Sequence, residues 1–422
     1  MATRPSALAP LRSYGFRLLW ASSLLWNFAR WTDILVAGWL ALELTNSAWL
    51  VALIGFYRNA PIPIFGAFAG AIADRFDRQR LVLAAQATNV AVIAAVASLL
   101  HLGLLEYWHL AAASLLLGLS WSLEFPCRRA LTPDLVGRDE VMPAIVLDTV
   151  SMNLMKVLGP IVGGGLLALL SIPEAYTLIA AIYLLGLLPI LGVRAPKGAV
   201  AAPAAATLRF IAEGLAFCAK HPPVRGVLLV TILMNCFAFP YIQLLSVFAR
   251  DILRVGPFEL GLLTAGDGIG SLIGLAILMS ARNLRRPGWL FVIGSAGFCL
   301  SLVGFAASPL FVASFALLIV AGICHSTFST FQSTIILGAV DAALRGRAMG
   351  VLTLAIGSAP VGMLLMGLVA ASLSAPWAVG LSAATGAALI AASAAATPGL
   401  LAYEAPTPEA PRTADRPARA MG

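Results

Sequence analysis

Charged residues are scarce in this sequence. Only 11% of the 422 residues are Asp, Glu, Lys or Arg, whereas 60% are hydrophobic and the mean hydropathy is +0.93. Soluble globular domains carry about 25% charged residues. The composition therefore excludes an ordinary soluble domain and predicts an integral membrane protein that has the lipid bilayer as a partner.

Short motifs of enzymes and metal sites are also missing. The sequence has no phosphate-binding GxxxxGK[ST] loop, no HExxH pair and no GxSxG elbow, and its four histidines lie far apart. The five cysteines form no CxxC pair and are interpreted as buried thiols. We expect no enzymatic activity, metal or cofactor. The basic excess follows no basic–aromatic pattern, so we expect no nucleic-acid partner.

Long apolar segments fill most of the chain. A spanning helix needs about 20 apolar residues, and in lipid only helices or closed barrels satisfy the backbone. The runs are long and show no strand-like alternation, which favours helices. The predicted spans are 17–43, 48–73, 80–102, 108–127, 143–170, 172–193, 223–250, 258–281, 288–307, 309–338, 346–372 and 376–400.

Basic residues are concentrated in every second loop between the predicted spans, that is, on one side of the membrane. All but five of the 27 Lys and Arg residues fall at the N-terminus, in loops after even-numbered spans, or in the tail. Cytoplasmic loops carry such an excess, so both termini are expected in the cytoplasm and the chain in the inner membrane. The first span follows no small-residue cleavage site, which indicates an uncleaved helix.

The spans divide into two halves. We expect an N-terminal six-helix bundle over 1–193, a cytoplasmic linker over 194–222, a C-terminal six-helix bundle over 223–401 and a disordered tail over 402–422. Within the linker, helical spacing of apolar residues predicts a short interfacial helix ending near Lys220. A pair of glycines four residues apart, Gly66 and Gly70, recurs as Gly270 and Gly274 about 200 residues later, which suggests that the two halves are related.

Ionisable residues inside the predicted spans indicate where the site lies, because such residues are costly in lipid and usually face a cavity or a partner. They are Arg30, Asp33, Arg58, Glu124, Asp148, Lys156, Asp267 and His325. Arg30 and Asp33 share a helix face and could pair, as could Glu124 and Arg128. The Arg30–Asp33 pair is either structural or part of substrate or proton binding. Asp33 is the preferred proton carrier, and His325 is either a carrier or a satisfied buried histidine.

Aromatic and amide residues at mid-span positions are candidates for a substrate cavity. They are Trp31, Trp121, Asn235, Tyr241 and Phe328. Aromatic walls suit amphiphilic organic substrates. The same residues could equally be packing residues of the helix bundles.

The stretch from Gly66 to Leu81 joins spans 2 and 3 and reads Gly-Ala-Phe-Ala-Gly-Ala-Ile-Ala-Asp-Arg-Phe-Asp-Arg-Gln-Arg-Leu. It resembles the signature loop of the major facilitator superfamily of transporters. Gly70, Asp74, Arg75 and Arg78 match the signature, whereas Asp77 replaces its second glycine. The resemblance implies that Asp74 lies near the start of span 11 and that Arg78 pairs with an acid below span 4, for which Asp134 is the candidate. These contacts would close the cytoplasmic side; an ordinary positive loop is the alternative.

Span 5 carries a second resemblance. Gly159-Pro160-Ile161-Val162-Gly163-Gly164 is similar to the Gly-Pro-x-x-Gly-Gly motif of the superfamily's antiporters, although Met155 stands in place of an upstream glycine. The motif implies export, whereas a simple proline kink is the alternative. In the superfamily spans 5 and 8 meet, so Lys156 and Asp267 could bridge the two halves; separate roles in lining the cavity are the alternative.

Other segments point to one branch of the superfamily. Arg17-Leu-Leu-Trp, Arg58-Asn-Ala-Pro61 and Leu344-Arg-Gly-Arg347 resemble the branch of enterobactin-type siderophore exporters and macrolide-efflux-like proteins. The chain departs from that branch at Arg30, where an acid is usual.

We predict an all-α membrane protein of 12 transmembrane helices in two six-helix bundles with pseudo-twofold symmetry. The predicted function is secondary active transport. We expect proton-coupled export of a small organic molecule, a drug-like compound or a siderophore, by a monomer. Alternatives are an importer or uniporter of the same fold, or a membrane sensor or assembly protein without transport activity. Charges deep in both halves argue against the last, because a scaffold need not bear their insertion cost.

Overall fold

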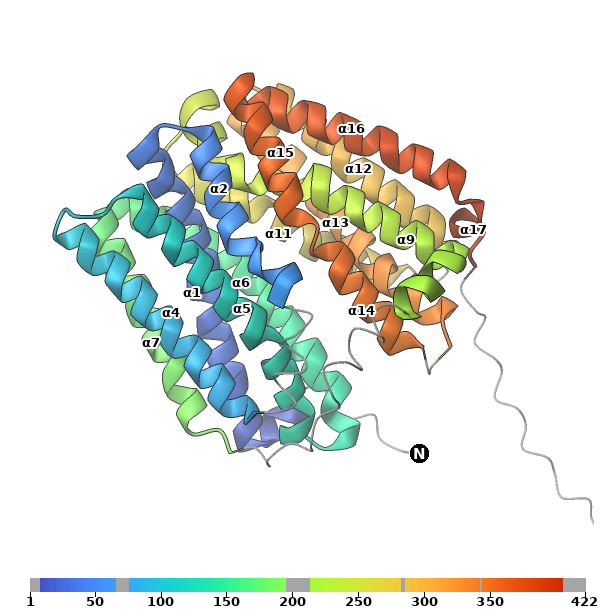
Figure 1. Ribbon diagram of the computed structural model, residues 1–422, viewed down its shortest axis with the longest axis horizontal. Coiled ribbons are helices and arrows are strands. Elements are labelled where there is room, and N and C mark those ends of the chain that lie inside the picture. Colours follow the sequence, from blue (N-terminus) through green and yellow to red (C-terminus); the bar gives the residue numbers. More distant parts are fainter. Residues whose placement is uncertain (1–7, 66–75, 195–212, 282–284, 342–343, 405–422) are drawn as a thin grey trace, which may run out of the picture.

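The computed structural model describes residues 8–65, 76–194, 213–281, 285–341 and 344–404 (Figure 1). Every regular element within these ranges is a helix. The N-terminal half contains η1 (Ala9–Arg12), α1 (Tyr14–Thr45), α2 (Ala48–Asn59), α4 (Arg78–His101), α5 (Tyr107–Leu135), η2 (Arg138–Glu140), α6 (Val141–Leu169) and α7 (Ile172–Leu191). The helix that begins with α2 continues to Phe65.

The C-terminal half begins after a short helix over 213–220. Its first span is irregular and consists of α9 (Pro222–Leu233), η3 (Met234–Ala238), η4 (Phe239–Leu244), α10 (Leu245–Val247) and η5 (Phe248–Ile252). The remaining elements are α11 (Pro257–Ser280), α12 (Pro287–Ala307), α13 (Phe311–Ala339), α14 (Arg345–Ile356), α15 (Ala359–Ser372), α16 (Ala375–Ala396) and α17 (Pro398–Leu401).

Eleven helices of the described residues are long and apolar enough to cross a membrane. Helix α1 has 32 residues and is also long enough, but it carries Arg30 and Asp33 within its length. Together they agree with the twelve predicted spans. The fourth prediction was too short, because α5 runs past Cys127 to Leu135. Burial of Leu131 and an ion pair of Arg128 stabilise this extra length.

Local capping explains where several helices begin and end. Ser13 Oγ accepts the backbone N–H of Phe16 at the start of α1, and Asn46 ends α1 in the left-handed conformation with φ of 49°. Asp77 Oδ1 accepts the N–H groups of Gln79 and Arg80 at the start of α4. Asp77 replaces a glycine of the signature, and here it serves as an N-cap.

The helices pack in two groups, which Figure 1 shows side by side. In the first group α1 packs against α6 and α7, and α4 packs against α5 and α7. In the second group α13 packs against α11 and α12, and α12 packs against α16. Helices α6 and α11, and helices α2 and α15, join one group to the other.

The two ends of the structure differ. We name the end where α1 begins the near end and the end where α1 stops the far end. At the far end Gly367 of α15 lies against Trp49 and Ala52 of α2, and Arg250 donates to the Leu42 carbonyl at 3.3 Å. The ribbons of the two groups diverge toward the near end (Figure 1). The groups therefore meet tightly at the far end.

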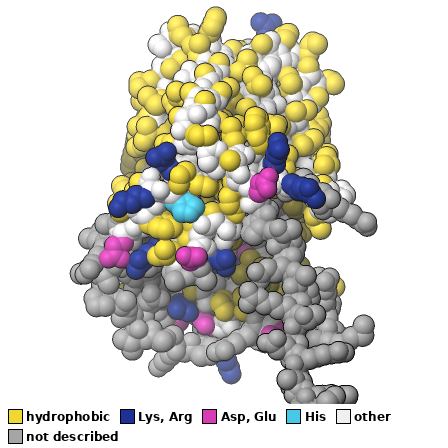
Figure 2. Space-filling view, turned by 90° about the vertical axis from the view of Figure 1, so that its right-hand side faces the viewer, with side chains coloured by type: hydrophobic (Ala, Val, Ile, Leu, Met, Phe, Trp, Pro, Cys, Tyr) yellow, Lys and Arg dark blue, Asp and Glu magenta, His cyan; other side chains and the backbone are white. Residues whose placement is uncertain are grey.

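The surface matches a protein embedded in lipid. Many large hydrophobic side chains are exposed, among them Leu300, Val312 and Trp377. On the face shown in Figure 2, hydrophobic side chains cover most of the upper part, with one basic side chain at the top, and charged side chains gather in the middle and lower parts. Such a division between an apolar band and a charged margin is expected at the edge of a bilayer.

Candidate functional site

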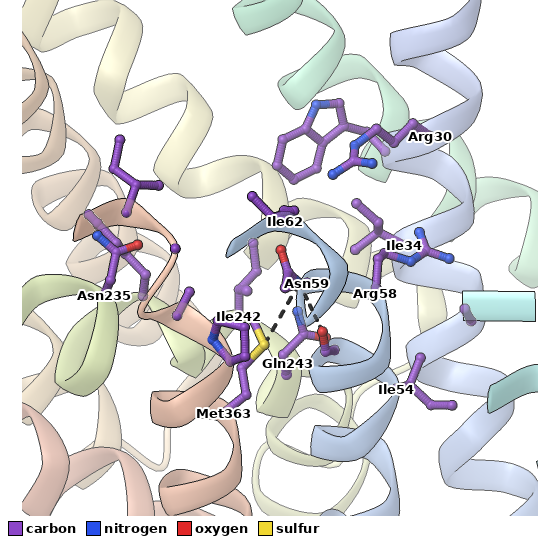
Figure 3. A pocket seen from close by; sticks show the side chains of 18 residues that line it. Arg30, Ile34, Ile54, Arg58, Asn59, Ile62, Asn235, Ile242, Gln243 and Met363 are labelled. Atoms are coloured by element: carbon purple, nitrogen blue, oxygen red, sulfur yellow. Dashed lines mark hydrogen bonds between the residues drawn. The ribbon is translucent and has the colours of Figure 1, made fainter. Parts of the chain in front are cut away.

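A cavity of about 230 Å³ lies between the two groups of helices. Figure 3 shows side chains of both groups around it. The first group supplies Arg30, Trp31, Ile34, Ala37, Ile54, Gly55, Arg58, Asn59 and Ile62, and the second supplies Asn235, Phe239, Ile242, Gln243, Ile356, Gly357, Ala359, Pro360 and Met363. The lining therefore combines two arginines and three amides with aliphatic and aromatic walls.

Irregular backbone places the second group's side chains in the cavity. The π-helical turn η3 carries Asn235, and the 3-10 turn η4 carries Gln243 shortly after Pro240. Single π turns often occur at functional sites. A Cβ at Gly55 of α2 would lie 2.3 Å from Gln243 Cδ. Glycine at position 55 therefore lets Gln243 reach the opposite group.

Asp33 and Arg58 form an ion pair beside the cavity. Arg58 Nη2 donates to Asp33 Oδ2 at 2.6 Å, and the two side chains are 5% and 1% exposed. The pairing of Arg30 with Asp33, which their spacing allows, does not form. The two residues share a helix, but the carboxylate is occupied by an arginine from α2. Gly118 of α5 permits this position, because a Cβ there would lie 2.2 Å from the Arg58 carbonyl oxygen.

Arg30 lies against aromatic rings instead. Its guanidinium carbon lies 4.0 Å from the Trp121 ring centre and 5.6 Å from the Trp26 ring centre. The two indoles stack with their centres 5.1 Å apart. Among the described residues, no carboxylate lies within 4.0 Å of Arg30 and no acceptor hydrogen-bonds its guanidinium. A half-buried cation thus faces the cavity, held by stacking alone.

Asp267 of α11 binds two basic residues. Lys156 Nζ of α6 donates to Asp267 Oδ2, and His325 Nδ1 of α13 lies 3.1 Å from Asp267 Oδ1. The predicted contact between Lys156 and Asp267 is present, and it joins the two groups of helices. Lys156 Nζ also lies 5.9 Å from the ring centre of Trp31, which lines the cavity.

A second buried carboxylate lies inside the first group. Arg128 Nη2 donates to Glu124 Oε1, as the spacing predicts, and Gln86 Nε2 donates to the same oxygen at 3.0 Å. Glu124 Oε2 has no hydrogen-bond partner within the described part of the chain. Asp148 accepts a hydrogen bond from Ser23 Oγ at 2.8 Å. Neither carboxylate is among the residues that line the cavity.

The glycine motif of α6 touches two helices. Cβ atoms at Gly159 and Gly163 would lie 2.6 Å from Trp31 Cβ and 3.3 Å from Thr32 Cγ2 of α1. A Cβ at Gly164 would lie 2.4 Å from the Pro257 carbonyl oxygen of α11. Thr32 Oγ1 donates to the Gly159 carbonyl at 3.1 Å. The motif therefore holds α6 between α1 in its own group and α11 in the other. Its second residue, Pro160, lies in the interior of α6.

The signature loop falls mostly outside the described residues. Gly70, Asp74 and Arg75 belong to that part, so their expected contacts are not described. Arg78 lies at the start of α4, where Nη1 donates to Asp134 Oδ2 at 2.8 Å. The pairing expected for Arg78 is thus present.

The aromatic candidates have different positions. Trp31 and Asn235 line the cavity, whereas Trp121 lies behind Arg30. Tyr241 and Phe328 do not line it: each is 3% exposed, and they pack against Phe298 and Phe291 in the core of the second group. Their assignment to the cavity was wrong. The irregular helix turns Tyr241 into the core, and Phe328 of the regular helix α13 stacks on Phe291 instead.

Sequence reasoning missed three polar or soft lining residues. They are Asn59, Gln243 and Met363. Asn59 Nδ2 lies 3.7 Å from Met363 Sδ across the two groups (Figure 3). Pro240 was the one local signal that the helix phase changes before Gln243. Within the described ranges, no three His, Cys, Asp or Glu side chains are grouped to hold a metal ion.

Comparisons with known proteins agree with this fold. A family model described as a transmembrane secretion effector matches residues 5–413. The enterobactin exporters EntS of Shigella boydii and Escherichia coli are 27% and 26% identical over 322 residues, which cover 74% of this chain and 74% of theirs.

Solved structures show the same architecture. A bacterial homologue of the human lysosomal transporter Spinster, in an inward-facing and occupied conformation, has a TM-score of 0.72 at 14% identity, over 93% of this chain and 97% of that one. A peptide transporter POT has a TM-score of 0.72 at 14% identity, over 92% and 95%. These likenesses confirm the predicted major facilitator fold. The chain therefore belongs to the transmembrane secretion effector family of major facilitator transporters.

Proposed function

We propose that this transporter exports a small organic molecule by alternating access, driven by the proton gradient. The observation that carries the proposal is the cavity between the two groups of helices, with polar and charged side chains from both. Substrate sites of such transporters lie near the midplane at the interface of the two repeats. The relatives named as enterobactin exporters support the outward direction.

In this proposal the two groups of helices move as the domains expected from the sequence, 1–193 and 223–401, joined by the linker over 194–222. The near end faces the cytoplasm, where both termini lie. The tight contacts at the far end then close the outer side, so that the cavity opens inward. The signature loop with Gly70, Asp74, Arg75 and Arg78 closes the near end when the groups rock. The protein works as a monomer and has no enzymatic activity.

The Asp33–Arg58 pair is the proposed site of proton coupling. A proton on Asp33 removes the charge that holds Arg58, and the pair re-forms when the proton leaves. The titratable and charged groups that face this pair are Arg30, which lies on α1 with Asp33, and the phenols of Tyr176 and Tyr183 on α7.

An efflux assay tests the proposed function. Cells that express the protein are loaded with a panel of anionic, neutral and cationic fluorescent compounds. We expect at least one compound to leave several-fold faster than from cells with the empty vector, and a proton uncoupler to abolish the difference. Accumulation of a compound would instead indicate import. Uncoupler-resistant movement down the gradient would indicate a uniporter. No movement of any compound would favour a sensor or an assembly protein.

The bridge between Lys156 and Asp267 gives a sharper prediction. Asp267→Asn removes the charge that neutralises Lys156 at the junction of the two groups. We expect transport to fall at least tenfold, and the exchanged pair Lys156→Asp with Asp267→Lys to recover part of it. The measurement is the initial rate of uptake into proteoliposomes with an imposed pH gradient.

Asp139→Asn is the matched control, because the Asp139 side chain is exposed in η2 of the first group. Interactions of exposed charges contribute about 0–1 kcal/mol, so the rate should change less than twofold. Full activity of Asp267→Asn would contradict a working role of the bridge.

A further inference from the structure

The charges around the cavity do not balance. Of the three Lys and Arg side chains beside it, Arg58 is paired with Asp33 and Lys156 with Asp267. Arg30 lines the cavity and lacks such a carboxylate within the described residues. Among the residues that the structure describes, no Asp or Glu lines the cavity. One positive charge therefore remains for a ligand to neutralise.

The position of Arg30 is suited to a planar anion. Its guanidinium carbon lies 4.0 Å from the Trp121 ring centre, and Trp121 itself stacks on Trp26. Among the described residues its N–H groups have no acceptor, and a guanidinium can donate to two carboxylate oxygens at once. In Figure 3 the side chain of Arg30 extends from α1 toward the interior of the pocket. A desolvated guanidinium with no acceptor is unfavourable, and an anionic ligand would supply the acceptor.

The rest of the lining indicates the body of the ligand. Trp31 and Phe239 provide flat apolar surfaces, and Asn59, Asn235 and Gln243 provide amide donors and acceptors. Such walls suit an aromatic compound with several oxygen atoms. A cationic amphiphile would meet Arg30 with no carboxylate to offset the repulsion.

We infer that Arg30 is the anion-binding residue of the cavity and that the exported compound is an aromatic organic anion. A carboxylate of this compound, or another group of anionic oxygen atoms, pairs with the Arg30 guanidinium. The inference rests on the proposed function, because it takes the cavity as the path of the exported compound.

Matched acid and amide probes test this inference. Salicylate, 2-naphthoate and 2,3-dihydroxybenzoate are each compared with their neutral primary amides. Binding to the purified full chain in lipid nanodiscs is measured by calorimetry. We expect at least one acid to bind tenfold or more tightly than its amide. Arg30→Gln should remove that preference by weakening acid binding at least tenfold while amide binding stays within twofold. Arg30→Lys should keep part of the preference, because the charge remains.

Arg129→Gln is the matched control. Arg129 also stacks on an aromatic ring, with its guanidinium 4.7 Å from the Phe125 ring centre, but it is exposed and does not line the cavity. Its binding profile should equal that of the wild type. The inference is overturned if the wild type prefers none of the three acids, absence of all binding included, or if the preference survives in Arg30→Gln.

Transport of the same probes into proteoliposomes separates the inference from the proposed function. Movement of the amides as fast as the acids would overturn the inference and leave the proposed transport function intact. An Arg30-dependent preference in binding with no transport of any compound would uphold the anion site and contradict the proposed function.

Discussion

Replacing Asp33 by alanine is expected to lower the free energy of unfolding by about 3–5 kcal/mol and to abolish transport. The substitution leaves the Arg58 guanidinium, 5% exposed, without the carboxylate that accepts its hydrogen bond at 2.6 Å. An uncompensated buried charge is costly, whereas the intact pair is close to neutral in free energy. The measurement is the thermal unfolding temperature of the purified protein, together with the transport rate in proteoliposomes.

A second substitution separates stability from function. Asp33→Ala combined with Arg58→Leu removes both charges, so the unfolding temperature should return close to that of the wild type. Transport should remain absent, because the proposed proton site is gone. Arg80→Ala serves as the control: Arg80 is 86% exposed and lies 3.7 Å from Asp77, so stability should change by less than about 1 kcal/mol. Proton-driven transport by the double variant would contradict the coupling role of this pair.

The sequence predicted the helices well because the signal is strong and local. A bilayer demands long apolar runs, and the observed spans follow those runs with errors of a few residues. The extension of α5 to Leu135 was not foreseen, because Pro126 and Pro133 are poor helix signals. Tertiary contacts outweigh them there, since Arg128 pairs with Glu124 and donates to the Leu19 carbonyl.

The partners of charged residues were harder to predict. Helical spacing shows which residues share a face, and this sufficed for Glu124 with Arg128. It does not show which residues of neighbouring helices face them. The sequence therefore could not reveal that Asp33 pairs with Arg58 of α2 and not with Arg30. The pair of Lys156 and Asp267 was anticipated because the family resemblance brings spans 5 and 8 together. Packing partners are thus a property of the fold, which spacing alone does not contain.

The cavity shows why helical periodicity fails where the backbone is irregular. A face assigned at 3.6 residues per turn keeps its phase only in a regular α-helix. The π turn at Met234–Ala238 and the 3-10 turn at Phe239–Leu244 both shift that phase. Tyr241 therefore points into the core and Gln243 lines the cavity. Asn235, which lies within the first turn of the irregularity, lines the cavity.

Replacing Gly164 by valine is expected to slow transport at least tenfold by opening the far end. Its Cβ would lie 2.4 Å from the Pro257 carbonyl oxygen and 3.0 Å from Gly261 Cα, and these are backbone atoms that no side-chain rotation can move away. Helices α6 and α11 must then separate. Overpacking costs about 1–3 kcal/mol, which shifts an equilibrium between two states by about 5–150-fold. The measurement is the distance between spin labels at Leu44 and Phe258, both exposed at the far end, together with the transport rate.

Gly165→Val is the matched control, since a Cβ at this adjacent glycine meets nothing within 4 Å. Gly164→Val and Gly165→Val change the helix propensity of α6 by the same amount, so any difference between the two variants comes from the contact of position 164 with α11. We expect the label distance to increase in Gly164→Val and to stay unchanged in Gly165→Val. Gly261→Val should give the same increase as Gly164→Val, because a Cβ at Gly261 would lie 2.6 Å from the Pro160 carbonyl oxygen of α6. Equal label distances and transport rates in the variants at 164 and 165 would mean that this glycine contact does not control the far end. An effect confined to the variants at 164 and 261 would tie the glycine motif of α6 to closure between the two groups of helices.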